Sequence, residues 1–426
     1  MSSGSAATGP HVLRRINATA VLNALRSSTN NAGNNASNNA GNNAGNNAGN
    51  NATDSHTATV SDLVVATGLS RPAVTRALTA LAEAGIAEFS GTTEHHIGRP
   101  AQRARFRAEL GHVAGIDIGP HKVVVLVADL AGTVLAQHQA VTPAGHTGDS
   151  VVRLLRDALT DVTTDAGITP TDLWSVAVGT PGIVDHDRGE VVLAPSIPGW
   201  SSLPVIAELR DWLGCPVAIE NDVNLAVVAE RWRGDDGDNL LFVQWGERIG
   251  TGMVIDDKPY RGASSAAGEL GFIDLVTDLD DEPKPPTDGL GAFERLVGAG
   301  EILRLGMARC DQPLRDRLAT TGDIAVLFDA ATAGDPAAVS VVDTIATRFA
   351  RGLAVQLLIM DPRCVIVGGG VSRAGDVLFD AVRKRLSRLL LVPADLRVSA
   401  LGVNNVALGA VRMALDAVEE RLTALL

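Results

Sequence analysis

The chain of 426 residues lacks the features of a secreted disulfide scaffold or a membrane protein. Its three cysteines, Cys215, Cys310 and Cys364, lie too far apart for a disulfide framework or a closely spaced thiolate metal site. No apolar run reaches the about 18 residues of a membrane span, and the N-terminus has no apolar core of signal-peptide length. We therefore expect a soluble, cytoplasmic and reduced protein, with a length that allows about three domains.

Positive charge is scarce overall, since the net charge is −13, which argues against a nucleic-acid partner. The charge is unevenly spread, however. Residues 1–110 contain nine Arg, no Lys and six acidic residues, a net charge of +3, so the remainder carries −16. A small basic head on an acidic body indicates two functions in one chain.

Residues 30–52 repeat an Asn-Asn-Ala-Gly unit with one Ser variant. A period of four without apolar side chains buries nothing, and Asn and Gly disfavour both helix and strand. We therefore predict a flexible, disordered insert with no required function. It interrupts a first domain that we place at residues 1–108.

Around this insert, short amphipathic segments have the spacing of a helix-turn-helix. A helix is predicted at 61–66 with Ser61 as its N-cap, then a turn, then a helix that opens at Ser70. The second helix has a buried stripe at i, i+3, i+4 and i+7, formed by Val74, Ala77, Leu78 and Leu81. The segment 86–89 and the alternating arginines at 103–107 are typical of a β-wing.

The exposed start of the second helix carries Ser70, Arg71, Thr75 and Arg76, residue types that donate to phosphates and guanine edges in the major groove. Arg99, between Gly and Pro, has the extended backbone suited to minor-groove insertion. These residues predict a DNA-binding domain. The alternative is a helical protein-interaction module whose arginines are merely solvated.

From Gly111 onward, predicted strands alternate with helices, which indicates an α/β body of two lobes. We place the lobes at 111–230 and 231–404, with a last helix at about 405–426 that packs back on the first lobe. Strands are predicted at 112–118, 122–129, 175–178, 216–219, 239–245, 252–255 and 363–367. Helices are predicted at 150–165, 203–213, 223–233, 293–309, 337–360, 375–390 and 407–426.

Five short motifs follow one another along the body: GIDIGPHK at 115–122, GTPG at 179–182 with PGW at 198–200, IENDVNLA at 219–226, AAGELG at 266–271 with GLGAFE at 289–294, and VIVGGGVS at 365–372. In this order, behind a winged helix-turn-helix, they resemble the ROK family of bacterial repressors and sugar kinases. The resemblance covers the whole chain and is to its repressor branch, such as the xylose and N-acetylglucosamine repressors. It implies a two-lobed ribonuclease-H/actin-like body.

The resemblance also implies a sugar site. Asp222 matches the family's catalytic base and Asn221 a ligand of a sugar hydroxyl, while Glu269 and Glu294 align with sugar-hydroxyl acceptors. A local interpretation competes for Asn221 and Asp222, because such residues just before a helix are common N-caps. In a relative without catalysis, Asp222 would still accept a hydrogen bond from a sugar.

The phosphate turns depart from the kinase pattern. Pro120 offers no N–H to a phosphate, His121 adds bulk, and Glu247 puts a carboxylate where γ-phosphate charge should sit. Arg248 would offset part of that charge by pairing with Glu247 or a phosphate. The triple glycine at 368–370 matches the adenosine side but is also a simple tight turn. The degraded nucleotide-binding positions are Asp117, Gly119, Lys122, Gly246, Gly368, Gly369 and Gly370. We therefore expect no ATP hydrolysis and no catalytic residue.

The family's zinc ligands fall on Phe272, Pro285, Thr287 and Ala292, none of which ligates zinc as the family does. We expect no zinc and no other cofactor, and we interpret Phe272 as filling the core in place of the metal.

The sequence thus predicts a sugar-responsive transcriptional regulator, most simply a repressor. Its expected partners are double-stranded operator DNA and a sugar or sugar-phosphate effector, with no membrane, and its expected assembly is a homodimer or homotetramer. Two alternatives stay open: an active sugar kinase with a DNA-binding head, and a DNA-binding protein whose body no longer binds sugar.

Overall fold

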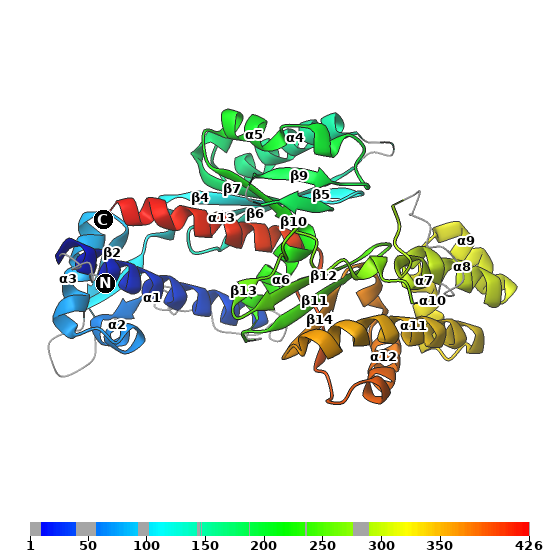
Figure 1. Cartoon of the computed structure of the whole chain (residues 1–426). Coiled ribbons are helices and arrows are strands. Elements are labelled where there is room, and N and C mark those ends of the chain that lie inside the picture. Colours follow the sequence, from blue (N-terminus) through cyan, green and yellow to red (C-terminus); the bar gives the residue numbers. More distant parts are fainter. Residues whose placement is uncertain are drawn as a thin grey trace, which may run out of the picture.

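The computed structural model shows an N-terminal unit followed by two α/β lobes (Figure 1). The N-terminal unit lies at one end of the molecule beside the C-terminal helix, and helix α6 lies where the two lobes meet. The structure describes residues 10–39, 57–92, 102–142, 145, 147–186, 188–234, 237–275 and 289–425.

The N-terminal unit has, in its described residues, three helices packed on a three-stranded antiparallel sheet of order β1-β3-β2. Its predicted buried stripe is confirmed, because Val74, Ala77, Leu78 and Leu81 are all buried, in one core with Val21 of the first helix. The elements are α1 (Pro10–Asn39), β1 (Ala58–Thr59), α2 (Val60–Thr67), α3 (Arg71–Glu83), β2 (Ala87–Thr92) and β3 (Gln102–Phe106).

Capping residues set the bounds of α2 and α3. The N-cap of α2 is Thr59, not Ser61 as predicted, because its hydroxyl accepts the backbone N–H of Asp62 at 3.2 Å. The Asp62 carboxylate accepts the Thr59 N–H in return at 2.9 Å. Gly68 then ends α2 with φ +67°, a conformation that glycine adopts without strain. Ser70 is the N-cap of α3 as predicted, although its hydroxyl makes no capping bond to the described helix backbone.

Helix α1 continues to Asn39, into the stretch 30–52 that was predicted to be disordered. That prediction was wrong for residues 30–39. Extending a helix adds one hydrogen bond per residue without a new nucleus, and α1 is anchored upstream by buried Val21, Leu22 and Leu25. Residues 40–52 lie outside the described part of the chain.

The first lobe contains a five-stranded sheet of order β10-β7-β4-β5-β6, in which β10, β7 and β4 are parallel. Strands β4 and β5 are almost wholly apolar because α4 and α5 cover one face of the sheet and the C-terminal helix covers the other (Figure 1). The elements are β4 (His112–Ile118), β5 (Lys122–Asp129), β6 (Val134–Val141), α4 (Gly148–Asp165), β7 (Leu173–Thr180), β8 (Ile183–Asp185), β9 (Glu190–Leu193), α5 (Val205–Leu213), β10 (Val217–Asn221) and α6 (Asp222–Arg233).

The second lobe repeats this plan with a five-stranded sheet of order β13-β12-β11-β14-β15. Its predicted helix at 293–309 is broken at Gly298, whose extended backbone packs against the carbonyl of Glu247. The elements are β11 (Leu240–Trp245), β12 (Ile249–Ile255), β13 (Lys258–Pro259), α7 (Glu294–Val297), α8 (Ala299–Arg309), α9 (Gln312–Thr321), α10 (Ala325–Thr332), α11 (Pro336–Met360), β14 (Cys364–Gly368), α12 (Asp376–Leu389) and β15 (Leu396–Val398).

Within the described ranges, no single helix is both long and apolar enough to cross a membrane. Helices α10 and α11 reach that length and composition only as a pair, bent by 113°.

Helix α13 (Asn405–Ala424) packs on the first lobe and shares a hydrophobic core with residues of the N-terminal unit and of the second lobe. It packs on β4, β7 and α6 so closely that two positions have no room for a side chain. A Cβ on Gly115 would lie 2.2 Å from the carbonyl oxygen of Ala407, and one on Gly409 would lie 1.9 Å from that of Leu225. At the far end of α13, Glu419 forms an ion pair of 2.9 Å with Arg26 of α1.

We predict that Gly409→Ala lowers the free energy of unfolding by about 1–3 kcal/mol, because the added methyl group meets backbone that cannot move aside cheaply. Urea titration would measure the loss. Gly300→Ala on α8 is the matched control, since a Cβ there has nothing within 4 Å, and it should leave stability unchanged or slightly raised. Equal stability of the two variants would contradict the close approach of α13 to α6.

Candidate functional site

The polar residues of the first lobe gather at one edge of its sheet. The parallel strands β4, β7 and β10 are in register such that Asp117 pairs with Gly179 and Asn221 with Thr180, at or beside the carboxyl end of each strand. In α/β sheets this edge is where ligands bind. In the second lobe, Gly246 follows β11 and Gly368 ends the neighbouring parallel strand β14.

Between the lobes lies a cavity of about 360 Å³, which we call the interlobe cavity. The first lobe contributes the loop after β7 and the start of α6, and the second contributes β12 and the loops that carry the Glu-containing motifs. The four predicted sugar residues, Asn221, Asp222, Glu269 and Glu294, all line it. Lining residues that the sequence analysis did not propose include Ser196, Gln244 and Arg248.

Asn221 is the N-cap of α6 and also lines the interlobe cavity. The capping role and the predicted place at the sugar site therefore hold together for this residue. Its side-chain oxygen accepts the backbone N–H groups of Val223 at 2.9 Å and Asn224 at 3.0 Å. Its amide nitrogen donates to the carbonyl of Gly182 at 2.8 Å. Asn221 therefore connects the GTPG motif to the start of α6, and it fixes the position of Asp222, the first residue of that helix.

Asp222 is the most perturbed carboxyl group of the cavity. Burial, followed by the neighbouring charge of Asp117, raises the pKa of Asp222 to about 7. Burial likewise raises the pKa of Asp117 to about 6, although the ammonium group of Lys122 acts in the opposite direction. Near neutral pH, Asp222 is thus divided between a form that accepts hydrogen bonds and one that also donates.

Glu294 is buried and already committed to backbone groups. One carboxylate oxygen accepts the N–H of Ile249 at 2.8 Å and the other accepts the N–H of Gly291 at 2.7 Å. It therefore holds β12 and the GLGAFE loop together while it lines the cavity. This role needs contacts between segments that are distant in sequence, so the motif alone did not indicate it.

Glu269 and Arg248 form the charged side of the second lobe. Burial and then the charge of Glu294 raise the pKa of Glu269, while Arg248 lowers it. Arg248 was expected to pair with Glu247 or a phosphate. It does not pair with Glu247, which is exposed: its guanidinium donates to the carbonyl of Gly289 at 2.6 Å and lines the cavity, and pairing with a phosphate stays a prediction.

Phe272 does not fill the core, contrary to the interpretation made from the sequence. It is 47% exposed and lines the cavity, because it belongs to a short 3₁₀ turn at the surface of the second lobe. Among the other positions aligned with zinc ligands, Ala292 is described, while Pro285 and Thr287 lie outside the described residues. The described ranges contain no group of three or more His, Cys, Asp or Glu side chains placed to hold a metal ion.

The nucleotide-side positions lie in turns at or beside the ends of β4, β11 and β14. In the turn between β4 and β5, Gly119 donates its N–H to the carbonyl of Lys122 at 2.8 Å. The Lys122 ammonium donates at 3.4 Å to the carbonyl of Val403, in the loop before α13. Gly369 has φ +89°, and a Cβ there would lie 2.5 Å from the carbonyl oxygen of Trp245. Packing alone therefore requires this glycine.

A second candidate surface lies on the N-terminal unit. Ser70, Arg71, Thr75 and Arg76 are all exposed on α3, opposite its buried stripe. Arg71 donates to the hydroxyl of Ser61 at 2.7 Å. Arg99 lies outside the described residues. Arg105 of β3 is engaged by Glu88 and Glu109, whereas Arg71 and Arg76 of α3 are exposed.

Two α/β lobes, each with a five-stranded sheet and with polar residues where the lobes meet, define the class of two-lobed, sugar-kinase-like proteins. The model of the ROK family matches residues 113–417. The chain belongs to the ROK family, as the sequence motifs predicted.

Relatives of two kinds match the chain. A xylose repressor of Caldicellulosiruptor bescii is 24% identical over 330 residues, which cover 75% of this chain and 82% of the relative. A glucokinase of Thermotoga maritima is 30% identical over 283 residues, which cover 64% of this chain and 86% of the relative.

Solved structures match as well. A ROK family glucokinase from Streptomyces griseus, in complex with glucose and AMPPNP, has a TM-score of 0.62 at 28% identity and covers 72% of this chain and 100% of its own. A ROK family transcriptional regulator, a homolog of the E. coli MLC protein, has a TM-score of 0.69 at 20% identity. It covers 86% of this chain and 94% of its own, and at that identity it shows the fold alone.

The raised pKa of Asp222 predicts a pH-dependent cost to stability. The pKa of this carboxyl group is about 3.8 in the unfolded chain and about 7 in the folded protein. The free energy of unfolding therefore falls as the pH rises from about 4 to about 7, because the unfolded chain releases the proton more readily. Asp222→Asn removes the cost. The variant should be more stable than the parent at pH 8, by on the order of 2–4 kcal/mol, with no gain at pH 4.

Urea titrations at both pH values measure this difference. The matched control is Asp157→Asn, which changes an exposed carboxyl group on α4 and should show no such gain. A parent protein at least as stable as Asp222→Asn at pH 8 would contradict the buried environment of Asp222.

Proposed function

We propose that this chain is a sugar-responsive DNA-binding regulator, most simply a repressor. Its N-terminal unit acts as a winged helix-turn-helix, and its interlobe cavity binds a sugar or sugar phosphate. The observation that carries the proposal is the presence, in one chain, of an exposed basic helix face and an interlobe cavity lined by carboxylates. Helix α13 packs on the first lobe and is paired with the N-terminal unit. The xylose repressor among the relatives supports it, as does a regulator fold that covers more of the chain than the two lobes occupy.

The chemistry of α3 suits a DNA major groove. Arg71 and Arg76 project from its first turns, where a recognition helix contacts base edges and phosphates. The bond from Arg71 to Ser61 is solvent-exposed, so it exchanges for a DNA contact at little cost. A homodimer or homotetramer would place two such helices on a pseudo-palindromic operator.

The chemistry of the interlobe cavity suits sugar hydroxyl groups. A hydroxyl both donates and accepts hydrogen bonds, so it satisfies carboxylates such as Asp222 and Glu269 and the guanidinium of Arg248 within one small site. Phe272 adds an apolar face at the cavity wall. Because these residues come from both lobes, a ligand that bonds to all of them draws the lobes together.

Helix α13 connects that closure with the N-terminal unit. Near its start, a Cβ on Gly179, at the end of β7, would lie 2.6 Å from the side chain of Val406, so β7 and α13 move together. Near its end, Glu419 is paired with the buried guanidinium of Arg26. An effector that changes operator affinity about 5–150-fold needs only about 1–3 kcal/mol of coupling through such a connection.

A sugar kinase is the second candidate, because Asp222 has the pKa near 7 that suits a general base and glucokinases are among the relatives. Pro120 and His121 in the phosphate turn, and the exposed carboxylate of Glu247, argue against it. Sugar-dependent ATP turnover that disappears in Asp222→Asn would establish the kinase. We further propose that the protein works without zinc, and stoichiometric zinc in metal analysis would overturn this.

The double variant Arg71→Ala, Arg76→Ala should lose sequence-specific DNA binding. Each bidentate arginine–guanine pair contributes about 1–3 kcal/mol of discrimination, so the loss is at least about 30-fold in affinity. Fluorescence anisotropy on the chain's own upstream DNA against scrambled DNA, at fixed salt, measures it.

The matched control for this experiment is Arg153→Ala with Arg388→Ala, which removes the same charge from exposed sites on the two lobes. It should bind as the parent does. If the α3 double variant also retains full specificity, the placement of DNA on α3 is wrong.

Replacing the two partners of the Arg26–Glu419 pair should have unequal effects. The Arg26 side chain is 8% exposed and that of Glu419 is 40% exposed, so Glu419→Gln leaves a buried guanidinium without its counter-charge. Arg26→Met leaves only a carboxylate that water reaches. Glu419→Gln should therefore be the less stable variant, by about 1–3 kcal/mol.

Thermal or urea unfolding compares the two variants. In both, the sugar response of operator binding should weaken while binding without sugar persists. A full sugar response in both variants would show that this ion pair does not couple the lobes to the N-terminal unit.

A further inference from the structure

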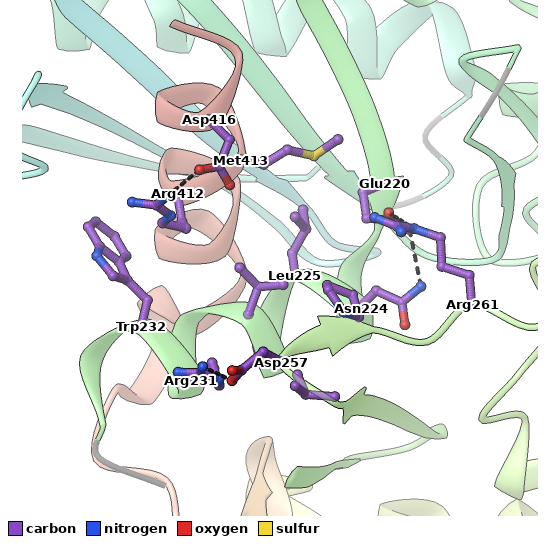
Figure 2. Close-up of a pocket in the computed structure, with 13 residues that line it drawn as sticks. Glu220, Asn224, Leu225, Arg231, Trp232, Asp257, Arg261, Arg412, Met413 and Asp416 are labelled. Carbon is purple, nitrogen blue, oxygen red and sulfur yellow. Dashed lines mark hydrogen bonds and ion pairs between the residues drawn. The ribbon is translucent and has the colours of Figure 1, made fainter. Parts of the chain in front are cut away.

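A second cavity, of about 480 Å³, opens between α6, the β12–β13 hairpin and α13 (Figure 2). We call it the hinge cavity. Of its lining residues, only Asn224 also lines the interlobe cavity, so the two are separate spaces on either side of the first turns of α6. Its volume lies within the range of about 300–1,000 Å³ typical of small-molecule sites.

Three arginine–carboxylate pairs converge on the described lining of the hinge cavity. Figure 2 shows Arg412 paired with Asp416 on α13, Arg231 with Asp257, and Arg261 near Glu220. The last pair joins Arg261 Nε and Glu220 Oε2 at 2.5 Å.

Glu220, at the floor of the cavity, is the most constrained of these carboxylates. It is 3% exposed, and besides Arg261 it accepts the side-chain amide of Asn224 at 3.1 Å. Since each guanidinium in the lining has a carboxylate partner, the cavity carries balanced charge and presents donors beside acceptors.

The remaining wall is apolar. Leu225 and Val254 are buried behind it, while Trp232 and Met413 are half-buried and border the space. Figure 2 shows Met413 and Trp232 on opposite sides of the opening, with Leu225 between them. The cavity is therefore lined by apolar side chains on one part of its surface and by three arginine–carboxylate ion pairs on the rest.

We propose that the hinge cavity is a second ligand site, specific for a neutral carbohydrate. A charged ligand would have to break one of the ion pairs or leave its own charge uncompensated, which is costly in a partly desolvated site. A sugar hydroxyl donates to a carboxylate and accepts from a guanidinium at once, so it bridges a pair without separating it. The C–H face of the ring fits the apolar wall.

The position of this site gives it a regulatory role. Asp416 lies one helical turn before Glu419 on α13, and Arg412 lies one turn before Asp416. Glu419 holds Arg26 of the N-terminal unit. A sugar that orders Arg412 and Asp416 therefore stiffens the part of α13 that contacts this unit, whether or not the interlobe cavity is occupied.

Isothermal titration of the full chain with glucose, xylose and maltose tests the proposal, with glucose 6-phosphate as the charged probe. The decisive variant is Val228→Trp, which fills the hinge cavity from α6, with Val228→Ala as the matched control. We expect at least one neutral sugar to bind Asp222→Asn, alone or combined with Val228→Ala, but not Asp222→Asn combined with Val228→Trp. Met413→Trp fills the same cavity from α13 and should act like Val228→Trp.

Different outcomes of these titrations would contradict a sugar site in the hinge cavity and sugar-sensing by the interlobe cavity. If no neutral sugar binds Asp222→Asn at millimolar concentration, or if both tryptophan variants bind all sugars as the parent does, the hinge cavity is not a sugar site. Preferential binding of glucose 6-phosphate that both tryptophan variants abolish would overturn the neutral class of ligand. Sugar-sensing by the interlobe cavity is judged separately, from binding that Val228→Trp retains and Asp222→Asn loses.

Discussion

The fold depends on the close packing of one helix, α13, against the first lobe and α6. Gly115 on β4 and Gly409 on α13 allow backbone to meet backbone, and any side chain at either position would force these elements apart. Because these contacts are so close, α13 cannot shift relative to α6 unless β4 moves with it. It therefore behaves as one rigid element that begins against the end of β7 and ends beside the N-terminal unit (Figure 1).

The interlobe cavity, by contrast, contains buried carboxyl groups whose ionisation destabilises the folded protein. Burial raises the pKa values of Asp222 and Glu269 in its lining, and the neighbouring charges of Asp117 and Glu294 raise them further. A cluster of this kind is unfavourable in an empty protein and favourable around a ligand that donates hydrogen bonds. This cost is the physical reason to look for ligand binding here.

Much of the fold could be predicted from the sequence, because buried strands and amphipathic helices leave strong local patterns. Strands β4 and β5 lie at the predicted residues, and the buried stripe of α3 is as predicted. The helix bounds at Thr59 and Gly298 were missed because they depend on reciprocal capping and on a close backbone contact. Helix α1 extends further than predicted, because a helix that is already anchored can continue into residues that would not start a helix by themselves.

The candidate site could be predicted only as a set of positions. Motifs identified Asn221, Asp222 and Glu269 at the cavity. They did not identify that Glu294 is held by two backbone amides, that Arg248 turns toward the cavity, or that Phe272 is exposed. Each of these facts depends on a contact between distant segments, which no local pattern encodes.

The central claim is that a ligand between the lobes changes how the N-terminal unit binds DNA. Its most direct test is the affinity of the full chain for its own upstream DNA, measured by fluorescence anisotropy at fixed salt with and without each sugar of a panel. The account predicts specific binding about 10³-fold or more tighter than to scrambled DNA, and a shift of about 5–150-fold with one sugar that Asp222→Asn reduces. Equal weak binding to both DNAs, unchanged by every sugar, would contradict it.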